Sequence, residues 1–461
     1  MIEFDKVSFR YEGQAEYILK DISFTVKEGE CLILAGGSGC GKTTITRLIN
    51  GLIPNFFTGL LSGSVKINGE DILGKQPHEL SKFVGSVFQN PRTQFFNTDT
   101  DSELVFGMEN LGIEYEEMHK RYEMTVEDLK LQKLCGKNIF SLSGGEKQSI
   151  AFGGVYALSP EIYVLDEPSA NLDKKAVKNL EKTLLRLKNK GKTIIVSEHR
   201  LYYLKDIADR LVMINDGKIT KEYTMSELSQ MTDDELHEKG LRSVRDTDIY
   251  NIPVSCPVDI PVLEVRNLNI CEKKKIILNR FGMIAKGGEI IGITGDNGTG
   301  KTTLARTVCG LMKQQSGEIY FNGVLTDAKT RQKCTFLVMQ DPNYQLFSDS
   351  VENEIKITLY GKSTDRETID FVLKALDLEK MKDKHPLSLS GGQKQRLCIA
   401  LAVLSDVKIL IFDEPTSGLD YKNMCRVADI LTKLAKEGKT LIIISHDGEF
   451  LKKICTKIIS L

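Results

Sequence analysis

The chain has 461 residues, enough for two to four domains with large cores, and its 62 basic and 63 acidic side chains leave a formal net charge of −1. That balance argues against a general nucleic-acid binder, which needs a basic excess or a basic stripe. The start lacks a signal-peptide core, no apolar run approaches the roughly 18–20 residues that cross a bilayer, and ten scattered cysteines form no CxxC pair. We therefore expect a soluble chain with reduced thiols in the cytosol.

Strand-like and helix-like segments alternate along both halves of the chain. Period-two alternation and short apolar runs predict strands, and the segments that follow the glycine-rich stretches predict helices. In the first half the expected strands lie at 2–11, 31–37, 162–168 and 193–199, and the expected helices at 42–52 and 146–158. In the second half the strands are expected at 263–270, 290–296, 409–415 and 441–447, and the helices at 301–311 and 393–404. This alternation predicts an α/β fold with a mostly parallel sheet.

Five motifs of the first half return in the same order in the second half. They are GGSGCGKTT (36–44) and GDNGTGKTT (295–303), VFQNPRTQFF (87–96) and VMQDPNYQLF (338–347), LSGGEKQ (142–148) and LSGGQKQ (389–395), VLDEPSANLD (164–173) and IFDEPTSGLD (411–420), and the histidines His199 and His446. The offset between partners falls from 259 residues at Lys42 to 251 at Gln89 and 247 thereafter, so the first copy carries twelve extra residues. Eight of the twelve precede Gln89, and we expect them within 50–63. The pattern predicts a tandem duplication.

A stretch rich in Pro and Asp, 244–262, separates the two copies and predicts a linker. We expect one domain at 1–235, the linker at 236–261 and a second domain at 262–461.

Both halves carry the phosphate-loop pattern Gly-x-x-x-x-Gly-Lys-Thr between a strand and a helix. Its glycines let backbone amides converge on phosphate oxygens, and the helix N-terminus adds partial positive charge. The lysine reaches the β- and γ-phosphates, and the threonine hydroxyl suits Mg²⁺. The expected nucleotide-binding residues of this loop are Gly36, Gly37, Ser38, Gly39, Cys40, Gly41, Lys42, Thr43 and Thr44 in the first half, and Gly295, Asp296, Asn297, Gly298, Thr299, Gly300, Lys301, Thr302 and Thr303 in the second.

An acid pair follows a buried-strand run in each half. The aspartates, Asp166 and Asp413, suit a Mg²⁺ ion bound through water, and the glutamates, Glu167 and Glu414, suit general-base work on an attacking water. Two histidines, His199 and His446, end later strands, where an imidazole reaches the γ-phosphate. A single histidine of this kind is more often structural, but its repetition favours the functional interpretation.

A Ser-Gly-Gly stretch opens a helix in each half and offers a second anion site built from amides and a hydroxyl. Its residues are Ser143, Gly144 and Gly145 in the first half, and Ser390, Gly391, Gly392 and Gln393 in the second. The stretch is either a simple helix cap or a site that completes the ATP pocket of the other domain.

A Walker A loop, a Q-loop, an LSGG signature, a Walker B motif with glutamate, a D-loop and a switch histidine in this order resemble an ABC ATPase, twice and over essentially the whole chain. The resemblance implies two α/β domains, each with a mostly parallel core sheet, an antiparallel β subdomain and a helical subdomain, packed head to tail with two ATP molecules and Mg²⁺ at the seams. It also implies Mg²⁺ sensing by Gln89 and Gln340 and adenine stacking by Tyr11, and it identifies Asp173 and Asp420 as the aspartates of the two D-loops.

The residues after each Q-loop glutamine resemble more narrowly the ATPases of energy-coupling factor (ECF) transporters, which import vitamins and transition metals. In that subgroup the second glutamine and its aromatic neighbours flank a groove for coupling helices of a membrane T component. The residues concerned are Gln94, Phe95 and Phe96, and Gln345, Leu346 and Phe347. We expect the two phenylalanines of the first half, with Leu346 and Phe347, to form an apolar patch for that partner; the alternative is that they pack the helical subdomain.

The resemblance implies an ATP-hydrolysing subunit at the cytoplasmic face of the cell membrane, with an integral-membrane T component and a substrate-binding S component as partners, and no nucleic acid. A soluble tandem ABC protein acting on ribosomes in translation is the alternative. Such proteins usually have a long charged linker, whereas the stretch 236–261 is short and not basic.

Three departures from the family pattern predict unequal ATP sites. They are Glu272 in place of Tyr11, Glu146 in place of Gln393, and Ser149 in place of Arg396. The resemblance implies that the phosphate loop of Lys301 forms one ATP site together with the Ser-Gly-Gly stretch of the first half. All three departures therefore lie in that one site. Because loss of one base–aromatic stack costs on the order of 1–3 kcal/mol, we expect weaker nucleotide binding there, unless a neighbouring side chain or the linker replaces the stack.

Overall fold

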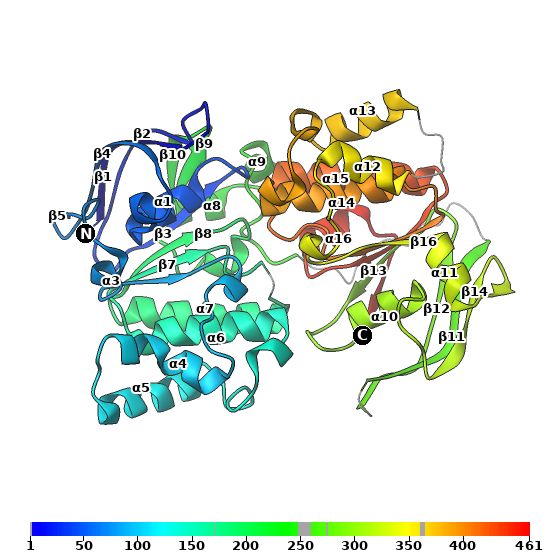
Figure 1. Cartoon of the computed structure of the whole chain (residues 1–461), viewed down its shortest axis with the longest axis horizontal. Coiled ribbons are helices and arrows are strands. Elements are labelled where there is room, and N and C mark those ends of the chain that lie inside the picture. Colours follow the sequence, from blue (N-terminus) through cyan, green and yellow to red (C-terminus); the bar gives the residue numbers. More distant parts are fainter. Residues whose placement is uncertain (1, 171, 248–259, 273–274, 360–364) are drawn as a thin grey trace. The chain divides into compact units, whose positions relative to one another are not determined.

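The computed structural model describes residues 2–170, 172–247, 260–272, 275–359 and 365–461, apart from the side chains of 272 and 275. The chain divides into two compact units, Met1–Asp246 and Thr247–Leu461. Each unit has the same two sheets and a set of helices, coloured from blue to green and from green to red in Figure 1. The expected α/β fold with two domains is confirmed.

Unit 1 holds an antiparallel sheet and a mostly parallel sheet. The antiparallel sheet has the order β2 (Leu19–Val26), β1 (Ile2–Tyr11), β4 (Gly59–Ile67) and β5 (Glu70–Asp71). The second sheet has the order β10 (Lys218–Thr224), β9 (Arg210–Asn215), β3 (Cys31–Gly36), β8 (Thr193–Ser197), β7 (Ile162–Asp166) and β6 (Val84–Val87). All of its neighbouring strands run parallel except β10 and β9.

Unit 2 repeats this plan. Its antiparallel sheet has the order β12 (Lys275–Lys286), β11 (Pro261–Glu272), β14 (Ser316–Phe321) and β15 (Val324–Leu325). Its parallel sheet has the order β16 (Thr335–Val338), β17 (Ile409–Asp413), β18 (Thr440–Ile444), β13 (Ile290–Thr294) and β19 (Lys457–Ser460).

Most of the helices come at corresponding places in the two units. Those of unit 1 are α1 (Lys42–Ile49), α2 (Leu52–Asn55), α3 (Pro77–Leu80), α4 (Thr100–Asn110), α5 (Tyr115–Asp128), α6 (Gly144–Leu158), α7 (Lys174–Asn189), α8 (Met225–Gln230) and α9 (Asp233–Glu238). Those of unit 2 are α10 (Lys301–Val308), α11 (Ala328–Cys334), α12 (Val351–Thr358), α13 (Arg366–Ala375), α14 (Gly391–Leu404), α15 (Tyr421–Lys436) and α16 (Gly448–Ile454). Helices α2, α8 and α9 of unit 1 have no counterpart among the described residues of unit 2. Short 3₁₀ turns η1 (Pro91–Thr93) and η4 (Pro342–Tyr344) follow β6 and β16.

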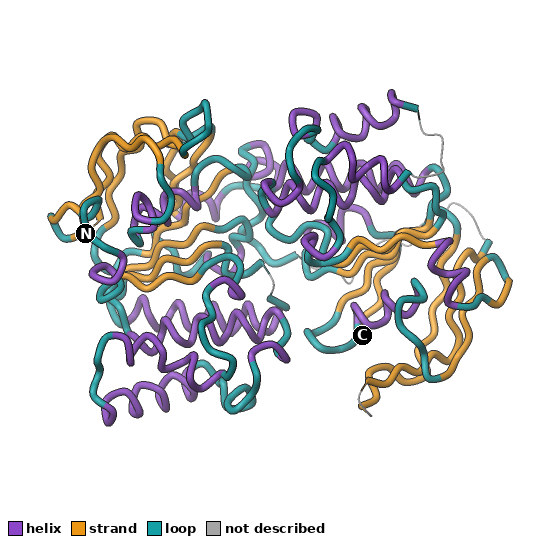
Figure 2. Tube along the Cα trace, in the orientation of Figure 1, coloured by secondary structure: helices purple, strands orange, loops and turns teal. Residues whose placement is uncertain are grey.

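Alternation along the parallel strands explains why helices cover both faces of the core sheet. In β3 the side chains of Leu32 and Leu34 pack into one core with α1, whereas Ile33 and Ala35 pack into another with α7. Successive side chains of a strand point to opposite faces, so a run that is apolar throughout must be buried on both. Figure 2 shows the resulting layers, with purple helices on either side of the orange strands in each unit.

The expected linker begins inside α9, and its first part belongs to the core of unit 1. The side chains of Leu236, Leu241 and Val244 are buried among residues of α7 and the core sheet. Most of the remaining stretch, residues 248–259, lies outside the described residues. The boundary between the two domains therefore stays a prediction.

The four residues expected to form one apolar patch divide into two kinds. Phe96 and Phe347 are each 76% exposed, whereas Leu346 is 4% exposed and belongs to the core of unit 2. Phe95 is half-buried against the small core formed by α4, α6 and the residues between them. The expectation of a shared patch is thus wrong for Leu346, because side chains at successive positions leave this turn in opposite directions.

This division predicts opposite effects for two adjacent substitutions. Leu346→Ala should lower the free energy of unfolding of unit 2 by about 2–5 kcal/mol, because it opens a cavity in a packed core. Phe347→Ala should change it by less than about 0.5 kcal/mol, because little buried contact is lost. Urea titrations of the two variants beside the wild type measure the difference. Equal losses would contradict the assignment of one side chain to the core and the other to the surface.

Candidate functional site

The phosphate loop of each unit lies between the end of a buried central strand and the start of a helix. In unit 1 the Lys42 ammonium is 5% exposed and donates to the carbonyl oxygens of Gly36 at 2.9 Å and Gly37 at 3.0 Å. In unit 2 Lys301 donates to the carbonyl oxygens of Gly295 at 2.6 Å and Asp296 at 2.8 Å. Both lysines are therefore held over their own loops by backbone dipoles.

Two glycines are structurally required in the loop of unit 1. Gly36 has φ +146°, and a Cβ there would lie 2.0 Å from the carbonyl oxygen of Ile214 on β9. Gly41 has φ +111°, and a Cβ would lie 2.5 Å from a methyl group of Leu19 on β2. No other residue fits these backbone angles and contacts without displacement.

Strand register brings the acid pair to the phosphate loop. In unit 1 Asp166 pairs with Ser197, which pairs in turn with Leu34, two residues before the loop. In unit 2 the Thr302 hydroxyl donates to Asp413 Oδ2 at 2.6 Å. Burial raises the pKa of both aspartates, against the hydrogen bonds of the loop threonines and the charges of the loop lysines.

The residues at this edge fit a Mg²⁺ ion. The threonine hydroxyls and aspartate carboxylates are hard oxygen ligands, which this ion prefers. Asp166 Oδ1 is buried and has no hydrogen-bond partner among the residues that the structure describes. The ion would thus be held by Thr43 and Asp166 in unit 1 and by Thr302 and Asp413 in unit 2, with Gln89 and Gln340 as further candidates.

Glu167 forms the centre of a small polar cluster in unit 1. Its Oε2 accepts from Gln89 Nε2 at 2.7 Å, and its Oε1 lies 3.6 Å from Nε2 of His199. Burial, together with the charge of Asp166, raises the pKa of Glu167 to about 8. Burial, aided by Lys42, lowers the pKa of His199 well below its usual value. The two side chains consequently meet as neutral groups near pH 7.

Unit 2 arranges its glutamate differently. Glu414 Oε2 accepts from the Ser445 hydroxyl at 3.1 Å and from the N–H of His446 at 3.4 Å. The imidazole Nε2 of His446 lies 3.7 Å from Glu414 Oε1 and 3.3 Å from Asn297 Oδ1 of the phosphate loop. The Q-loop glutamine of this unit, Gln340, follows β16 and is exposed.

The Ser-Gly-Gly stretches are helix N-termini, and they differ in charge. In unit 1 Ser143 caps α6, and its hydroxyl donates to Glu146 Oε2 at 2.8 Å. In unit 2 Ser390 caps α14, and the neutral Gln393 Oε1 accepts from its N–H at 2.9 Å. Glu146 thus engages the serine hydroxyl and adds a negative charge at the place where an anion would bind, which opposes the helix dipole's attraction for phosphate.

Ser149 leaves a cavity where unit 2 has a buried arginine. Arg396 is 3% exposed, and its Nε donates to the carbonyl oxygen of Leu376 at 2.8 Å. The corresponding region of unit 1 is a cavity of about 80 Å³ between α6 and α7, lined by Ser149 and by the buried amide of Gln148. The substitution therefore changes the packing behind the signature helix as well as its charge.

The D-loop aspartates cap the helices that follow. Asp173 accepts from the N–H of Ala176 at the start of α7, and Asp420 accepts from that of Asn423 at the start of α15, both at 2.7 Å.

Tyr11 is held by groups that sequence reasoning did not single out. Its hydroxyl lies 3.1 Å from Thr44 Oγ1 and accepts from Arg47 at 3.0 Å. The Arg47 guanidinium lies 3.9 Å from the ring centroid of Phe57, which contacts Tyr11 edge to face. Phe57 lies in 50–63, the stretch in which the eight extra residues were expected. Strand register gives an offset of 254 at Ile67 and Phe321, so five of the eight (259 − 254) lie before β4 ends and the other three lie between β4 and Gln89. The side chain of the matching Glu272 lies outside the described residues.

The second glutamine of each Q-loop pins the backbone of the turn. Gln94 accepts from the N–H of Phe88 at 3.3 Å and donates to the carbonyl oxygen of Ser86 at 3.1 Å. Gln345 makes the same pair of bonds, to Met339 at 3.1 Å and Leu337 at 3.0 Å. A glutamate also missed by sequence reasoning completes the turn: Glu103 and Glu354 accept from the N–H groups of Phe96 and Phe347, respectively. The sequence did hold a signal for the glutamine and for the glutamate: each residue is repeated unchanged 251 positions later in the chain.

Among the described residues, no helix is both long and apolar enough to cross a membrane. In the same part of the chain no group of three or more His, Cys, Asp and Glu side chains suits a metal ion. The metal position described above therefore depends on threonine and aspartate oxygens.

Comparison with known proteins gives one consistent family. A sequence model of the ABC transporter family matches residues 19–170 and 278–417. A protein of Treponema denticola, provisionally named an ABC transporter ATP-binding protein, is 47% identical over 100% of this chain and 95% of its own length. A Bacillus subtilis protein, provisionally named the HMP/thiamine import ATP-binding protein YkoD, is 30% identical over 100% of this chain and 90% of its own.

Among solved structures, a chain in a model of ribosome-bound archaeal Pelota and ABCE1 superposes with a TM-score of 0.71 at 20% identity, covering 98% of this chain and 76% of that one. At this identity the likeness is one of fold.

The raised pKa of Glu167 predicts a pH dependence of stability. The unfolded chain releases this proton near pH 4.5 and the folded unit only near pH 8, so the stability of the folded state falls as pH rises through that window. Glu167→Gln removes this loss of stability, because the amide does not titrate. In metal-free and nucleotide-free protein, the variant should therefore gain stability over the wild type progressively from pH 5 to pH 8, as measured by urea unfolding. Parallel stability curves across that range would contradict the assignment.

Proposed function

The chain belongs to the ABC transporter family and carries its ATP-binding domain twice, and we propose that it hydrolyses ATP in both domains to energise an ECF-type importer of a vitamin or a transition-metal ion. One observation carries the catalytic part. In each unit a phosphate loop, an acid pair with a buried aspartate and a histidine meet at the same edge of a parallel sheet. Ligand sites of open α/β sheets lie at this edge, outside the carboxyl ends of the strands.

The chemistry follows from the positions of these groups. The Lys42 ammonium counters charge on the β- and γ-phosphates of ATP, which phosphoryl transfer requires. Burial raises the pKa of Glu167 to about 8, so its carboxylate, once deprotonated, is a strong acceptor for the proton of the attacking water that it is placed to orient. His199, kept neutral by burial, contacts the γ-phosphate. Bound Mg²⁺ would supply further charge neutralisation from the threonine and aspartate oxygens described above. In unit 2 the same tasks belong to Lys301, Glu414 and His446.

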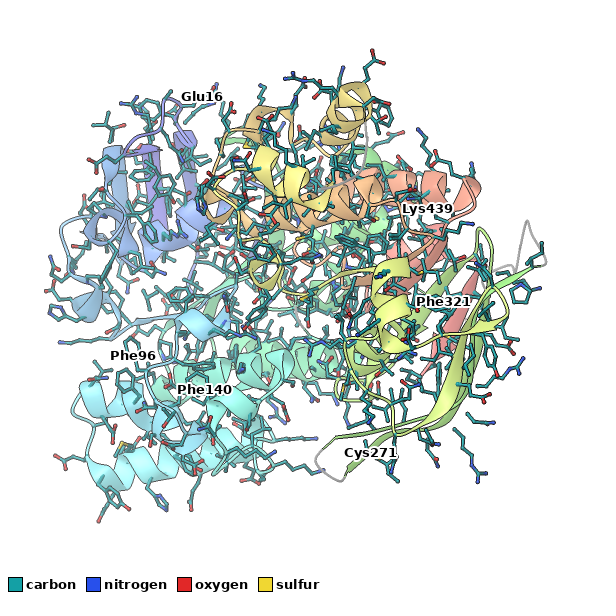
Figure 3. The ribbon with its side chains drawn as sticks, turned by 45° about the vertical axis from the view of Figure 1, so that its right-hand side comes forward. Glu16, Phe96, Phe140, Cys271, Phe321 and Lys439 are labelled. Atoms are coloured by element: carbon teal, nitrogen blue, oxygen red, sulfur yellow. The ribbon has the colours of Figure 1, made fainter. Side chains whose placement is uncertain are left out.

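Exposed apolar side chains support the proposal of a membrane partner. Phe96 and Phe140, labelled in Figure 3, are each 76% exposed, and both belong to the helical part of unit 1. Their segments lie side by side, since the N–H of Ile139 donates to the carbonyl oxygen of Thr98 at 2.8 Å. The corresponding residues of unit 2, Phe347 and Leu387, are also exposed. A large apolar residue exposed at the same two positions of both units is typical of a docking site for an apolar helix.

The transported substrate class is inferred from the relatives and the Q-loop segment. The name of YkoD refers to import of HMP and thiamine, and that protein resembles this chain over the full length. We infer an importer of the same general kind. The likeness to ribosome-associated structures is one of fold and does not favour a function in translation.

The proposed base predicts a separation of binding from turnover. The double variant Glu167→Gln and Glu414→Gln should bind ATP with Mg²⁺ and lose at least about 100-fold in hydrolysis, because an amide does not accept the proton of water. Filter binding of radiolabelled ATP and phosphate release measure the two quantities. Undiminished phosphate release in the double variant would remove both glutamates from the catalytic role.

The docking surface predicts loss of the partner without loss of ATP binding. Changing Phe96 and Phe347 together to Ser should release co-purifying membrane protein from the detergent-solubilised complex, because the buried apolar contact is removed. Phe56→Ser is a matched control, since Phe56 is 71% exposed and lies elsewhere on unit 1. Retention of membrane protein by the double variant, or co-purification of ribosomes in its place, would overturn the transporter assignment.

A further inference from the structure

A buried carboxylate stands directly before the switch histidine of unit 1. Glu198 is 3% exposed and follows β8. Its Oε1 accepts from the N–H groups of His199 at 2.7 Å and Arg200 at 3.1 Å. Its Oε2 accepts from the hydroxyl of Tyr203 at 2.9 Å and from the N–H of Ser169 at 3.3 Å. One side chain therefore ties the histidine turn to the loop that follows β7.

Unit 2 makes the same connection with an acid two residues further along. The residues of unit 2 that correspond to Ser169, Glu198, Arg200 and Tyr203 are Thr416, Ser445, Asp447 and Phe450, respectively. Asp447 is 4% exposed, accepts from the Thr416 hydroxyl at 2.8 Å and accepts from the N–H of Phe450 at 3.3 Å. The acid again joins the histidine turn to the loop after the central strand, here β17.

The hydrogen-bond partners of the acid differ between the two units together with the position of the acid. A buried carboxylate must be fully hydrogen-bonded, or it costs several kcal/mol. In unit 1 the tyrosine hydroxyl meets this requirement at the position where unit 2 has a phenylalanine. In unit 2 the place of Glu198 is taken by Ser445, whose hydroxyl donates to Glu414 at 3.1 Å. The two units thus hold their histidine turns with two different hydrogen-bond networks.

We propose that Glu198 is a positioning residue of the ATP site in unit 1: it aims His199 at the γ-phosphate and couples that turn to the loop after Glu167, the task that Asp447 performs in unit 2. The proposal rests on the proposed function, because it assumes that ATP binds at Lys42. It assigns Glu198 no contact with nucleotide, so its effect must appear through the histidine.

The test measures how well the site distinguishes ATP from ADP, which differ in the γ-phosphate. Lys301→Ala provides a background in which Lys42 carries the remaining intact phosphate loop. In this background ATP and ADP compete with a fluorescent ADP analogue in the presence of Mg²⁺. Glu198→Ala should lower the preference for ATP about tenfold, the equivalent of one hydrogen bond to a charged group, and leave the affinity for ADP within about twofold. His199→Ala sets the reference value.

A transplanted network separates positioning from a general role in folding. The combination Ser169→Thr, Glu198→Ser, Arg200→Asp and Tyr203→Phe gives unit 1 the residues of unit 2, and should recover the ATP preference to within about threefold of the parent. Glu198→Gln retains the size of the side chain and serves if the alanine variant does not fold; it should lose part of the preference. An unchanged preference in the Glu198 variants, or a transplant no better than Glu198→Ala, overturns the proposal. A Lys301→Ala parent that binds no ATP would instead contradict the proposed function.

Discussion

The parallel pairing of three central strands is the constraint on which both candidate sites depend. In unit 1 it sets Leu34, Ser197 and Asp166 in one row across β3, β8 and β7, and in unit 2 it sets Ile293, Ile444 and Asp413 in the same row. Because the carboxyl ends of parallel strands meet at one edge, residues far apart in the sequence meet there. The pairing of the strands is therefore enough to bring the phosphate loop, the acid pair and the histidine together. The apolar strand residues, buried on both faces, fix the register that places them.

The two units share one fold, but the residues around their candidate sites differ. In unit 1 Phe57 contacts Tyr11, Glu146 accepts from the signature serine, and Glu198 holds the histidine turn. Unit 2 has a neutral glutamine at its signature and an aspartate at its histidine turn. These differences lie outside the strands of the core sheet, so the fold stays the same, and we expect them to make the two sites bind nucleotide unequally. Under the proposed function, the two halves would contribute unequally to the same transport event.

Sequence reasoning reached the α/β fold, the duplication and the residues at the sheet edge, because periodicity and repeated motifs encode them. It failed where the answer depends on the direction of a single side chain. Leu346 and Phe347 are adjacent apolar residues, yet one is in the core and the other at the surface. The bonds that the second Q-loop glutamine makes to the backbone of its own turn were not foreseen either. The exchange of acids at the histidine turns was equally hidden, since only the hydrogen bonds show that Glu198 and Asp447 connect corresponding loops.

Separate ATP titrations of Lys42→Ala and Lys301→Ala test most directly the central claim, that both halves bind nucleotide and do so unequally. Each substitution removes the ammonium that lies over one phosphate loop. The Lys301→Ala variant should retain the tighter of the two affinities, by very roughly tenfold, because it keeps both Tyr11, which is expected to stack on adenine, and Lys42. Equal affinities in the two variants would contradict the claim of inequality, and loss of all binding in either one would contradict the claim of two independent phosphate loops.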